Sequence, residues 1–312
     1  MRERSFVPLS ALELRDAVRR ALPYDPLRLD RILHHDESSG LIEVQGSARW
    51  KTLAAYLRPG DAQAATARTT MSTVADSIAR NAAGPDGTPA VAHVESLTLV
   101  TPDGDLRRAS RYANRDLFAL TVGGQGLFGV LYSVTLRVDS MARALEHAAP
   151  SEKLIADADA TSQQALQLLL PPARVAHCVA EIHSRCAERH TALLALEVRR
   201  TREENETLLR WASRDFAEIR LELGAAATLG QTVRSAQLTR EFIDIAIAHG
   251  GSFPIACTPQ ATRAQIEACY PQLKSFLAEK RLRDPAERLV NRWYREHRGL
   301  FERGGAVVRW GP

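Results

Sequence analysis

The chain lacks several features that would place it in a specialised class of protein. Its 312 residues include four cysteines, and none of them forms a C-x-x-C pair. The first six residues, Met1-Arg-Glu-Arg-Ser-Phe6, do not provide the apolar segment of a signal peptide. Both features predict a reduced, cytoplasmic protein.

Long apolar runs and long basic runs are also missing. No stretch approaches the roughly twenty apolar residues that a membrane-spanning helix needs. The 41 basic and 37 acidic residues are interleaved and leave a formal charge of +4. Charges mixed in this way are typical of a solvated surface, so we expect neither a membrane nor a nucleic acid as a partner. A small-molecule ligand is expected, and a protein partner is an alternative.

Glycine is distributed unevenly along the chain. None occurs before Gly40, whereas Gly123, Gly124, Gly126 and Gly129 are crowded between two apolar runs. Such crowding predicts a tight turn with a close backbone approach. A bound ligand and a strand-to-strand turn would both require it, so the glycines alone leave these two interpretations open.

Periodicity predicts the elements of the first part of the chain. The segment from Ser10 to Leu22 reads as an amphipathic helix, and its first residue forms a capping box with Glu13. Further helices are expected at residues 50–57 and after Asn114, and strands at 29–33, 41–45, 94–100 and 129–138. A break is expected over residues 139–150.

The second part alternates predicted helices and strands. Helices are expected at residues 165–170, 175–190, 231–249 and 261–280, and strands at 193–198, 216–223 and 252–257. This pattern predicts an α+β layer packed on the first domain. The predicted domains are residues 1–140 and 141–290, followed by a C-terminal tail of residues 291–312.

Residues His183, Cys186 and His190 fall at helical spacing of three and four. One helix face could present all three to a metal ion. No fourth ligand can be assigned, and the helix is rich in arginine and glutamate. An ordinary amphipathic helix is therefore favoured, and no metal is predicted.

One series of short motifs resembles a known family. In order over about seventy residues, the chain carries Ile78, Asn81 and Gly84, then Asp103-Gly104, then Asn114-x-Asp-Leu-Phe118, then the four later glycines. This series resembles the FAD-linked oxidase family, with the fold of vanillyl-alcohol oxidase and para-cresol methylhydroxylase and an alditol oxidase-like group within it. Residues 242–294 resemble the end of that family's substrate domain.

The resemblance implies an α+β fold with an FAD-binding domain, here truncated, and a smaller α+β substrate or cap domain. It implies that FAD oxidises an alcohol group of a small molecule. The cofactor-binding residues that it implies are Ser77, Ile78 and Asn81 near the ring, Gly84, and Gly123, Gly124, Gly126, Gly129 and Val130 on the adenine and pyrophosphate side.

The chain departs from the family pattern at its phosphate-binding positions. A glycine-free link, Arg20 to Arg28, stands where the family has its first phosphate loop. Ala75 and Asp76 replace the paired glycines of the second, and a carboxylate there would repel a diphosphate. In the alternative interpretation, Asp76 only caps the following helix and meets no ligand.

Two further departures concern the ring and the substrate. Ala83 stands where the family has a histidine, and residues 253–262 lack the family's polar and aromatic side chains. No general base can be assigned there, so the catalytic residues stay unknown. We therefore expect an FAD-linked oxidoreductase whose flavin affinity is weakened or lost. The alternative is a flavin-free relative that binds a small molecule or a partner protein, or a non-redox enzyme of the cyclase or lyase type.

Overall fold

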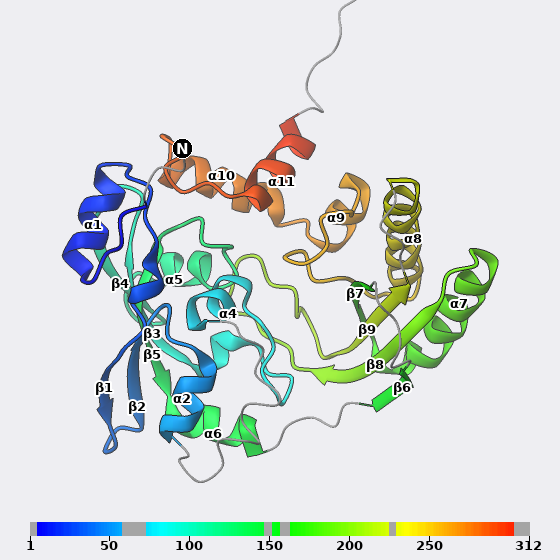
Figure 1. Cartoon of the computed structure of the whole chain (residues 1–312), viewed down its shortest axis with the longest axis horizontal. Coiled ribbons are helices and arrows are strands. Elements are labelled where there is room, and N and C mark those ends of the chain that lie inside the picture. The colour runs from blue at the N-terminus through cyan, green and yellow to red at the C-terminus, as the bar shows by residue number, and fades with distance from the viewer. Residues whose placement is uncertain (1–4, 58–72, 147–151, 157–162, 225–228, 303–312) are drawn as a thin grey trace, which may run out of the picture. The chain divides into compact units, whose positions relative to one another are not determined.

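The computed structural model describes residues 5–57, 73–146, 152–156, 163–224 and 229–302. The chain divides into two compact units (Figure 1). The first unit comprises Met1–Pro150, Arg200–Asp215 and Glu279–Leu289. The second comprises Ser151–Arg199, Phe216–Ala278 and Val290–Pro312. Each unit is therefore built from segments that are far apart in the sequence.

The first unit combines short helices with a five-stranded sheet. Its elements are α1 (Ala11–Arg19), η1 (Pro26–Arg28), β1 (Ile32–Asp36), β2 (Leu41–Gln45), α2 (Trp50–Leu57), α4 (Val74–Arg80), η2 (Ala90–His93), β3 (Val94–Val100), β4 (Leu106–Ser110), α5 (Arg115–Thr121), β5 (Val130–Arg137) and α6 (Val138–Glu146). Helix α6 lies where a break is predicted, because the alternation of β5 ends at Arg137 and residues 138–146 take up an amphipathic helical pattern instead.

The sheet of the first unit is antiparallel, in the order β1-β2-β5-β3-β4. Its register aligns Val44, Val134, Leu97 and Ala109 in one row across four strands. All four are fully buried. Because side chains alternate between the faces of a strand, this row marks the core side of the sheet.

Helix α1 begins after Ser10 as predicted, but only the Ser10 half of the predicted capping box forms. The Ser10 hydroxyl accepts a hydrogen bond from the amide of Glu13, whose carboxylate accepts one from the amide of Leu9. The helix buries Leu14 and Val18 against Leu29 and Val100. Tyr24, Val130 and Tyr132 pack against this cluster, and burial raises the pKa of Tyr24 to about 12.

The second unit contains a four-stranded sheet in the order β6-β8-β9-β7. Its elements are β6 (Glu152–Ala156), β7 (Gln163–Leu170), η3 (Pro172–Arg174), α7 (Val175–Glu188), β8 (Leu193–Thr201), β9 (Phe216–Gly224), α8 (Leu229–Ala248), α9 (Arg263–Cys269) and α11 (Arg292–Glu302), and α10 (Leu273–Arg283) extends from this unit into the first. Helix α8 contacts both β7 and α7, so the two long helices form one layer beside the sheet (Figure 1).

Two predicted elements of the second unit were wrong in type. Residues 165–170, predicted as helix, lie in strand β7, which pairs with β9 along its whole length. Residues 252–257, predicted as a strand, form turns, and only Ser252 makes a bridge, to Leu169. Short apolar runs fit a helix or a strand equally well, and here pairing with a neighbouring strand decided the outcome.

The helix predicted at residues 261–280 is two helices. The first of them, α9, begins at Arg263, because the Thr262 hydroxyl and the side chain of Gln265 form a capping box. Helix α9 then ends at Cys269, just before Tyr270-Pro271, and α10 starts at Leu273. A proline in the helix interior would remove a backbone hydrogen bond, which explains the break.

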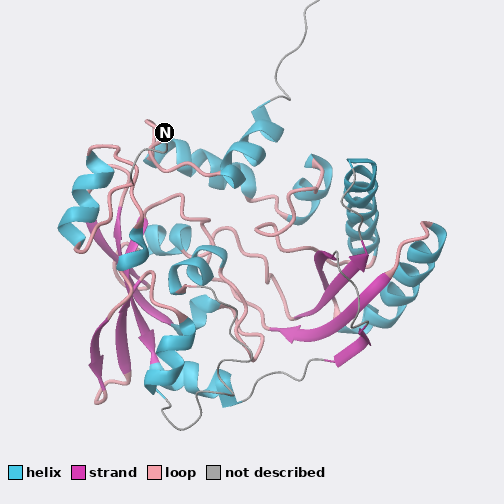
Figure 2. Ribbon diagram, viewed as in Figure 1, coloured by secondary structure: helices cyan, strands magenta, loops and turns pink. Residues whose placement is uncertain are grey.

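The strands group into two sheets instead of alternating regularly with helices, which makes the fold α+β (Figure 2). None of the helices in the described part of the chain is both long enough and apolar enough to cross a membrane.

Candidate functional site

The start of helix α4 is the position at which the resemblance places a phosphate-binding turn. The hydroxyl of Thr73 caps this helix and accepts the amide of Asp76 at 3.2 Å. The amides of Val74 and Ala75 donate to the carbonyl oxygens of Ala48 and Gly46, both at 2.8 Å. All three first-turn N–H groups are therefore bonded to atoms of the protein itself.

Asp76 is the third residue of α4 and not its cap. Its carboxylate pairs with the guanidinium of Arg80, one turn further along the helix. An acidic residue in the first turn is stabilised by the helix dipole. The residue therefore has a structural role, although the capping itself belongs to Thr73.

The other end of α4 is joined to the glycine segment. The amide of Gly123 donates to the carbonyl of Ile78 at 2.9 Å, and the amide of Gln125 donates to the carbonyl of Ala79 at 2.8 Å. These carbonyls lie in the last turn of α4, where a helix leaves its acceptors unpaired. The glycine turn, residues 123–126, thus closes the C-terminus of the helix.

Two of the four glycines, Gly124 and Gly129, are required by local packing, and the other two have a positive φ. A Cβ on Gly124 would lie 1.9 Å from the carbonyl oxygen of Leu120, and one on Gly129 would lie 2.2 Å from a methyl carbon of Leu99. Gly123 has a φ of +74°, and its Cβ would lie 3.4 Å from that of Asn81. Gly126 also has a positive φ, of +72°, but nothing lies within 4 Å of its Cβ position.

Asn81 is fully buried and ends α4 in the left-handed conformation, with a φ of 49°. Its side-chain amide donates to a carboxylate oxygen of Glu204 at 3.2 Å, and its side-chain oxygen accepts the amide of Val91 at 2.9 Å. Its backbone carbonyl accepts the indole N–H of Trp211, also at 2.9 Å. Two segments, η2 and the connection between β8 and β9, therefore converge on this one residue.

The remaining predicted cofactor residues have partners elsewhere in the first unit. The hydroxyl of Ser77 accepts the indole N–H of Trp50 at 2.8 Å. The amide of Gly84 donates to the carbonyl of Thr88 at 2.8 Å. Val130 is part of the apolar cluster under α1. The structure thus brings Ile78, Asn81 and Gly123 together, and places Gly84 and Val130 in separate surroundings.

His93 lies next to the Gly84 loop. It is buried, and one ring nitrogen, Nδ1, is 2.7 Å from the hydroxyl of Ser140. Burial lowers the pKa of His93, and the nearby carboxylate of Asp86 opposes this shift only in part. The imidazole is therefore kept neutral near physiological pH.

In the second unit, residues 253–262 contribute backbone to a buried tyrosine. The hydroxyl of Tyr270 donates to the carbonyl of Phe253 and accepts the amide of Ile255 at 3.2 Å. Burial raises the pKa of Tyr270 well above its usual range. This phenol holds the turn in place through its two hydrogen bonds. It stays protonated near neutral pH and therefore cannot act as a general base.

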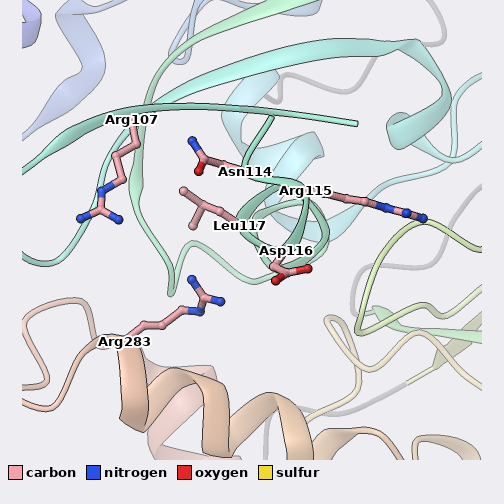
Figure 3. A pocket seen from close by; sticks show the side chains of 6 residues that line it. All are labelled: Arg107, Asn114, Arg115, Asp116, Leu117 and Arg283. Atoms are coloured by element: carbon pink, nitrogen blue, oxygen red, sulfur yellow. The ribbon is translucent and has the colours of Figure 1, made fainter. Parts of the chain in front are cut away.

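A hollow of about 220 Å³ lies beside α5, lined by Arg107, Asn114, Arg115, Asp116, Leu117 and Arg283 (Figure 3). Arg107 is paired with Asp103 and Asp105, and Arg283 is paired with Glu279. The side chain of Arg115 points away from the other two guanidiniums (Figure 3). Because the charges of Arg107 and Arg283 are already paired and Asp116 adds a carboxylate to the lining, the hollow is a poor match for a phosphate.

The metal alternative finds no support in the described part of the chain, which holds no group of three or more His, Cys, Asp or Glu side chains suited to a metal ion. Helix α7 buries Cys186, while His183 and His190 are exposed to solvent.

Glu204, Trp211 and Trp50 were missed by sequence reasoning, although they contact predicted site residues. Glu204 lies in the run Arg202-Glu-Glu-Asn-Glu206, which has the composition of a solvated loop. No local pattern separates the buried carboxylate of this run from its exposed neighbours.

Comparison with known proteins gives one finding. Residues 13–110 match the family model of the FAD binding domain. The match includes α4, Asn81 and Gly84, and ends before the glycine turn. Over these residues the match agrees with the resemblance to the FAD-linked oxidase family. No curated protein matches the chain.

Proposed function

We propose that this chain, whose residues 13–110 carry an FAD binding domain of the FAD-linked oxidase type, has weakened or lost its affinity for flavin. On this proposal the protein acts by binding a small molecule or a partner, on a scaffold that it shares with the oxidases. The proposal rests on one observation, which is that the first-turn N–H groups of α4 are already hydrogen-bonded to protein oxygens.

A diphosphate needs free N–H groups at a helix start. In α4 the amides of Val74, Ala75 and Asp76 already donate to Ala48, Gly46 and Thr73. A phosphate oxygen would have to replace these bonds, and each buried acceptor left without its donor would cost about 1–3 kcal/mol. The residues present therefore do not fit the pyrophosphate of FAD.

Charge acts in the same direction. The carboxylate of Asp76 lies within this first turn and belongs to an ion pair with Arg80. A dianionic diphosphate beside it would meet like-charge repulsion in a partly desolvated place. The link from Arg20 to Arg28 adds only the short η1 turn and no glycine loop that could compensate.

The glycine turn does not restore a site. Its amides at Gly123 and Gln125 donate to α4, and Gly124 and Gly129 are needed by packing against Leu120 and Leu99. Glycines that serve the fold in this way are retained whether or not a ligand is bound.

The second candidate function is FAD-dependent oxidation of an alcohol, which the family match favours. In that case the purified protein should be yellow and should bleach when an alcohol substrate reduces the flavin. Residues 253–262 contain no carboxylate and no imidazole that could act as a general base for this reaction. Tyr270, which bonds to the backbone of this segment, stays protonated because burial raises its pKa.

An absorbance spectrum and an FAD titration of the purified full chain test the proposal. We expect a colourless protein and an FAD dissociation constant weaker than about 0.1 mM, which corresponds to less than about 5.5 kcal/mol of binding free energy. Saturable binding in the micromolar range would contradict it.

The double variant Ala75→Gly/Asp76→Gly is the sharper test. It restores the family glycines and removes the carboxylate, but it leaves the backbone bonds from α4 to Ala48 and Gly46 in place. We expect FAD binding to stay weak. If the variant binds FAD tightly, the side chains of Ala75 and Asp76 exclude the cofactor in the wild type, and the hydrogen-bonded amides of α4 do not.

A further inference from the structure

The connection between β8 and β9 is irregular in structure but belongs to the first unit. We call residues 202–212 of this connection the strap. Four of its side chains are buried, those of Glu204, Thr207, Leu209 and Ala212. Burial of this extent in a loop requires that its polar groups find partners in the protein.

The carboxylate of Glu204 organises the strap. One oxygen accepts the amides of Glu206 and Thr207, at 2.8 and 3.0 Å. The other accepts the side-chain amide of Asn81 at 3.2 Å and the hydroxyl of Thr207. All four donors come from the protein, so the acceptor positions of this buried carboxylate are satisfied.

Two more hydrogen bonds attach the strap to Asn81 and to helix α5. The indole N–H of Trp211 donates to the carbonyl of Asn81 at 2.9 Å. The amide of Leu208 donates to the carbonyl of Ala119, in α5 just before the glycine turn, also at 2.9 Å. The carbonyl oxygen of Leu209 lies 3.9 Å from the Cβ position of Gly123.

A third attachment involves the loop after Gly84. The amide of Arg202 donates to the carbonyl of Gly87 at 2.9 Å. Gly87 has a φ of +81°, and a Cβ there would lie 2.0 Å from the carbonyl oxygen of Arg200. Glu206 pairs with Arg111, which in turn donates to the carbonyl of Val91 at 2.8 Å.

The strap therefore bonds to Asn81 and lies beside Gly123, two residues that the family resemblance assigns to the flavin. We propose that the strap takes the structural place of the cofactor: it couples the Asn81 turn to the glycine turn and covers the surface that both would offer to a flavin. The inference rests on the proposed function, because it treats the flavin as dispensable.

Hydrogen exchange on the full chain without FAD tests the coupling. The variant Glu204→Gln keeps the shape of the side chain but cannot accept all four donors. We expect exchange on the order of tenfold faster at the amides of Val91, Gly123 and Gln125 together, since these bonds would open as one unit. The matched control is Glu203→Gln, the same charge change at the exposed neighbouring residue, which should leave these rates unchanged.

A second variant covers the case in which Glu204→Gln does not fold. Trp211→Phe removes one indole N–H and keeps an aromatic side chain, and we expect the same set of amides to exchange faster. If either folded variant exchanges faster only within residues 202–212, the strap is not coupled to the two turns and the inference is wrong.

The two proposals fail separately. Tight binding of FAD by the wild-type chain would contradict the proposed function, whatever the exchange rates are. Unchanged exchange at Val91, Gly123 and Gln125 in both variants would contradict the coupling, whatever the FAD titration shows. If FAD binds the wild-type chain while the strap amides stay protected, the strap does not cover the flavin surface.

Discussion

The ammonium group of Lys280 donates a 2.8 Å hydrogen bond to the carbonyl oxygen of Leu127, 153 residues earlier in the chain. Lys280 also pairs with Asp284, and both side chains are buried. Burial lowers the pKa of Lys280, and the hydrogen bond to Asp284 opposes that shift. Burial alone would raise the pKa of Asp284, but bonds from Lys280 and from the amides of Leu289 and Arg288 lower it. The pair holds residues 279–289 against the glycine segment.

Loss of Lys280 should destabilise the protein strongly. In Lys280→Met the carboxylate of Asp284 keeps its two amide donors but loses its counter-ion inside the unit. Removing one partner of a buried pair costs about 3–5 kcal/mol, and we expect a loss of that size in the free energy of unfolding.

Chemical denaturation measures this loss. Lys274→Met is the control, because Lys274 pairs with Glu267 at the surface and exposed pairs contribute at most about 1 kcal/mol. The double variant Lys280→Met/Asp284→Asn should recover part of the stability, because it removes both charges of the buried pair. Equal effects at positions 280 and 274 would show that the buried pair is not an important contact.

The glycines should differ in their tolerance of alanine. Gly124→Ala would force a Cβ to within 1.9 Å of the backbone oxygen of Leu120, so the turn must move. At Gly126 the Cβ position is open, and only the positive φ is unfavourable, which costs about 1 kcal/mol.

Thermal unfolding of the two alanine variants compares these effects in the cofactor-free protein. We expect Gly124→Ala to be clearly the less stable of the two. A larger loss of stability in Gly126→Ala would contradict the open space at the Cβ position of Gly126.

Much of the first unit could be predicted from sequence, because its signals are local. The capping residue Ser10 starts its helix where expected, and strand 94–100 has the predicted bounds. Strand β7 was assigned wrongly, because its identity depends on pairing with β9, about fifty residues away. Local periodicity carries no information about such a partner.

The stability of the protein should decrease in mild acid. His93 and His297 are buried, and burial lowers the pKa of both below the usual 6.5. Above about pH 6.5 the imidazoles are neutral in the folded and the unfolded chain, so they contribute no pH dependence. Below it the unfolded chain binds protons that the folded chain does not, and the free energy of unfolding falls by up to about 1.4 kcal/mol per pH unit for each histidine.

Denaturation between about pH 7.5 and 5.5 tests this prediction. His93→Gln should have a smaller slope than the wild type over that range. Identical slopes would mean that His93 is protonated in the folded state and that its burial does not control its charge.

The cysteines should differ in reactivity. Burial raises the pKa of Cys178 to about 12, and it also raises the pKa of Cys186 and Cys269. Cys257 is exposed. Because the thiolate is the reacting form, an aromatic disulfide reagent should titrate one thiol quickly in the native chain and four after unfolding. Cys257→Ser should abolish the fast phase, and a fast phase that survives would place another thiol at the surface.

The candidate site was harder to predict than the fold. Asn81 and the glycines could be named from their order in the sequence, but their partners could not. Glu204 and Trp211 lie more than 120 residues beyond Asn81 and in no regular element. Their role depends on how the β8–β9 connection folds back on the first unit, which no local pattern encodes.

The composition of the first unit has a consequence for synthesis of the chain. Its last segment, Glu279–Leu289, supplies the buried pair under the glycine segment, and its middle segment, Arg200–Asp215, includes the strap. As the ribosome makes the N-terminal residues first, Asn81 and Leu127 must wait for partners that are translated much later. A ribosome-bound fragment ending at residue 150 would expose both turns to chaperones and proteases. The first unit can be completed only after the residues up to Leu289 have been translated.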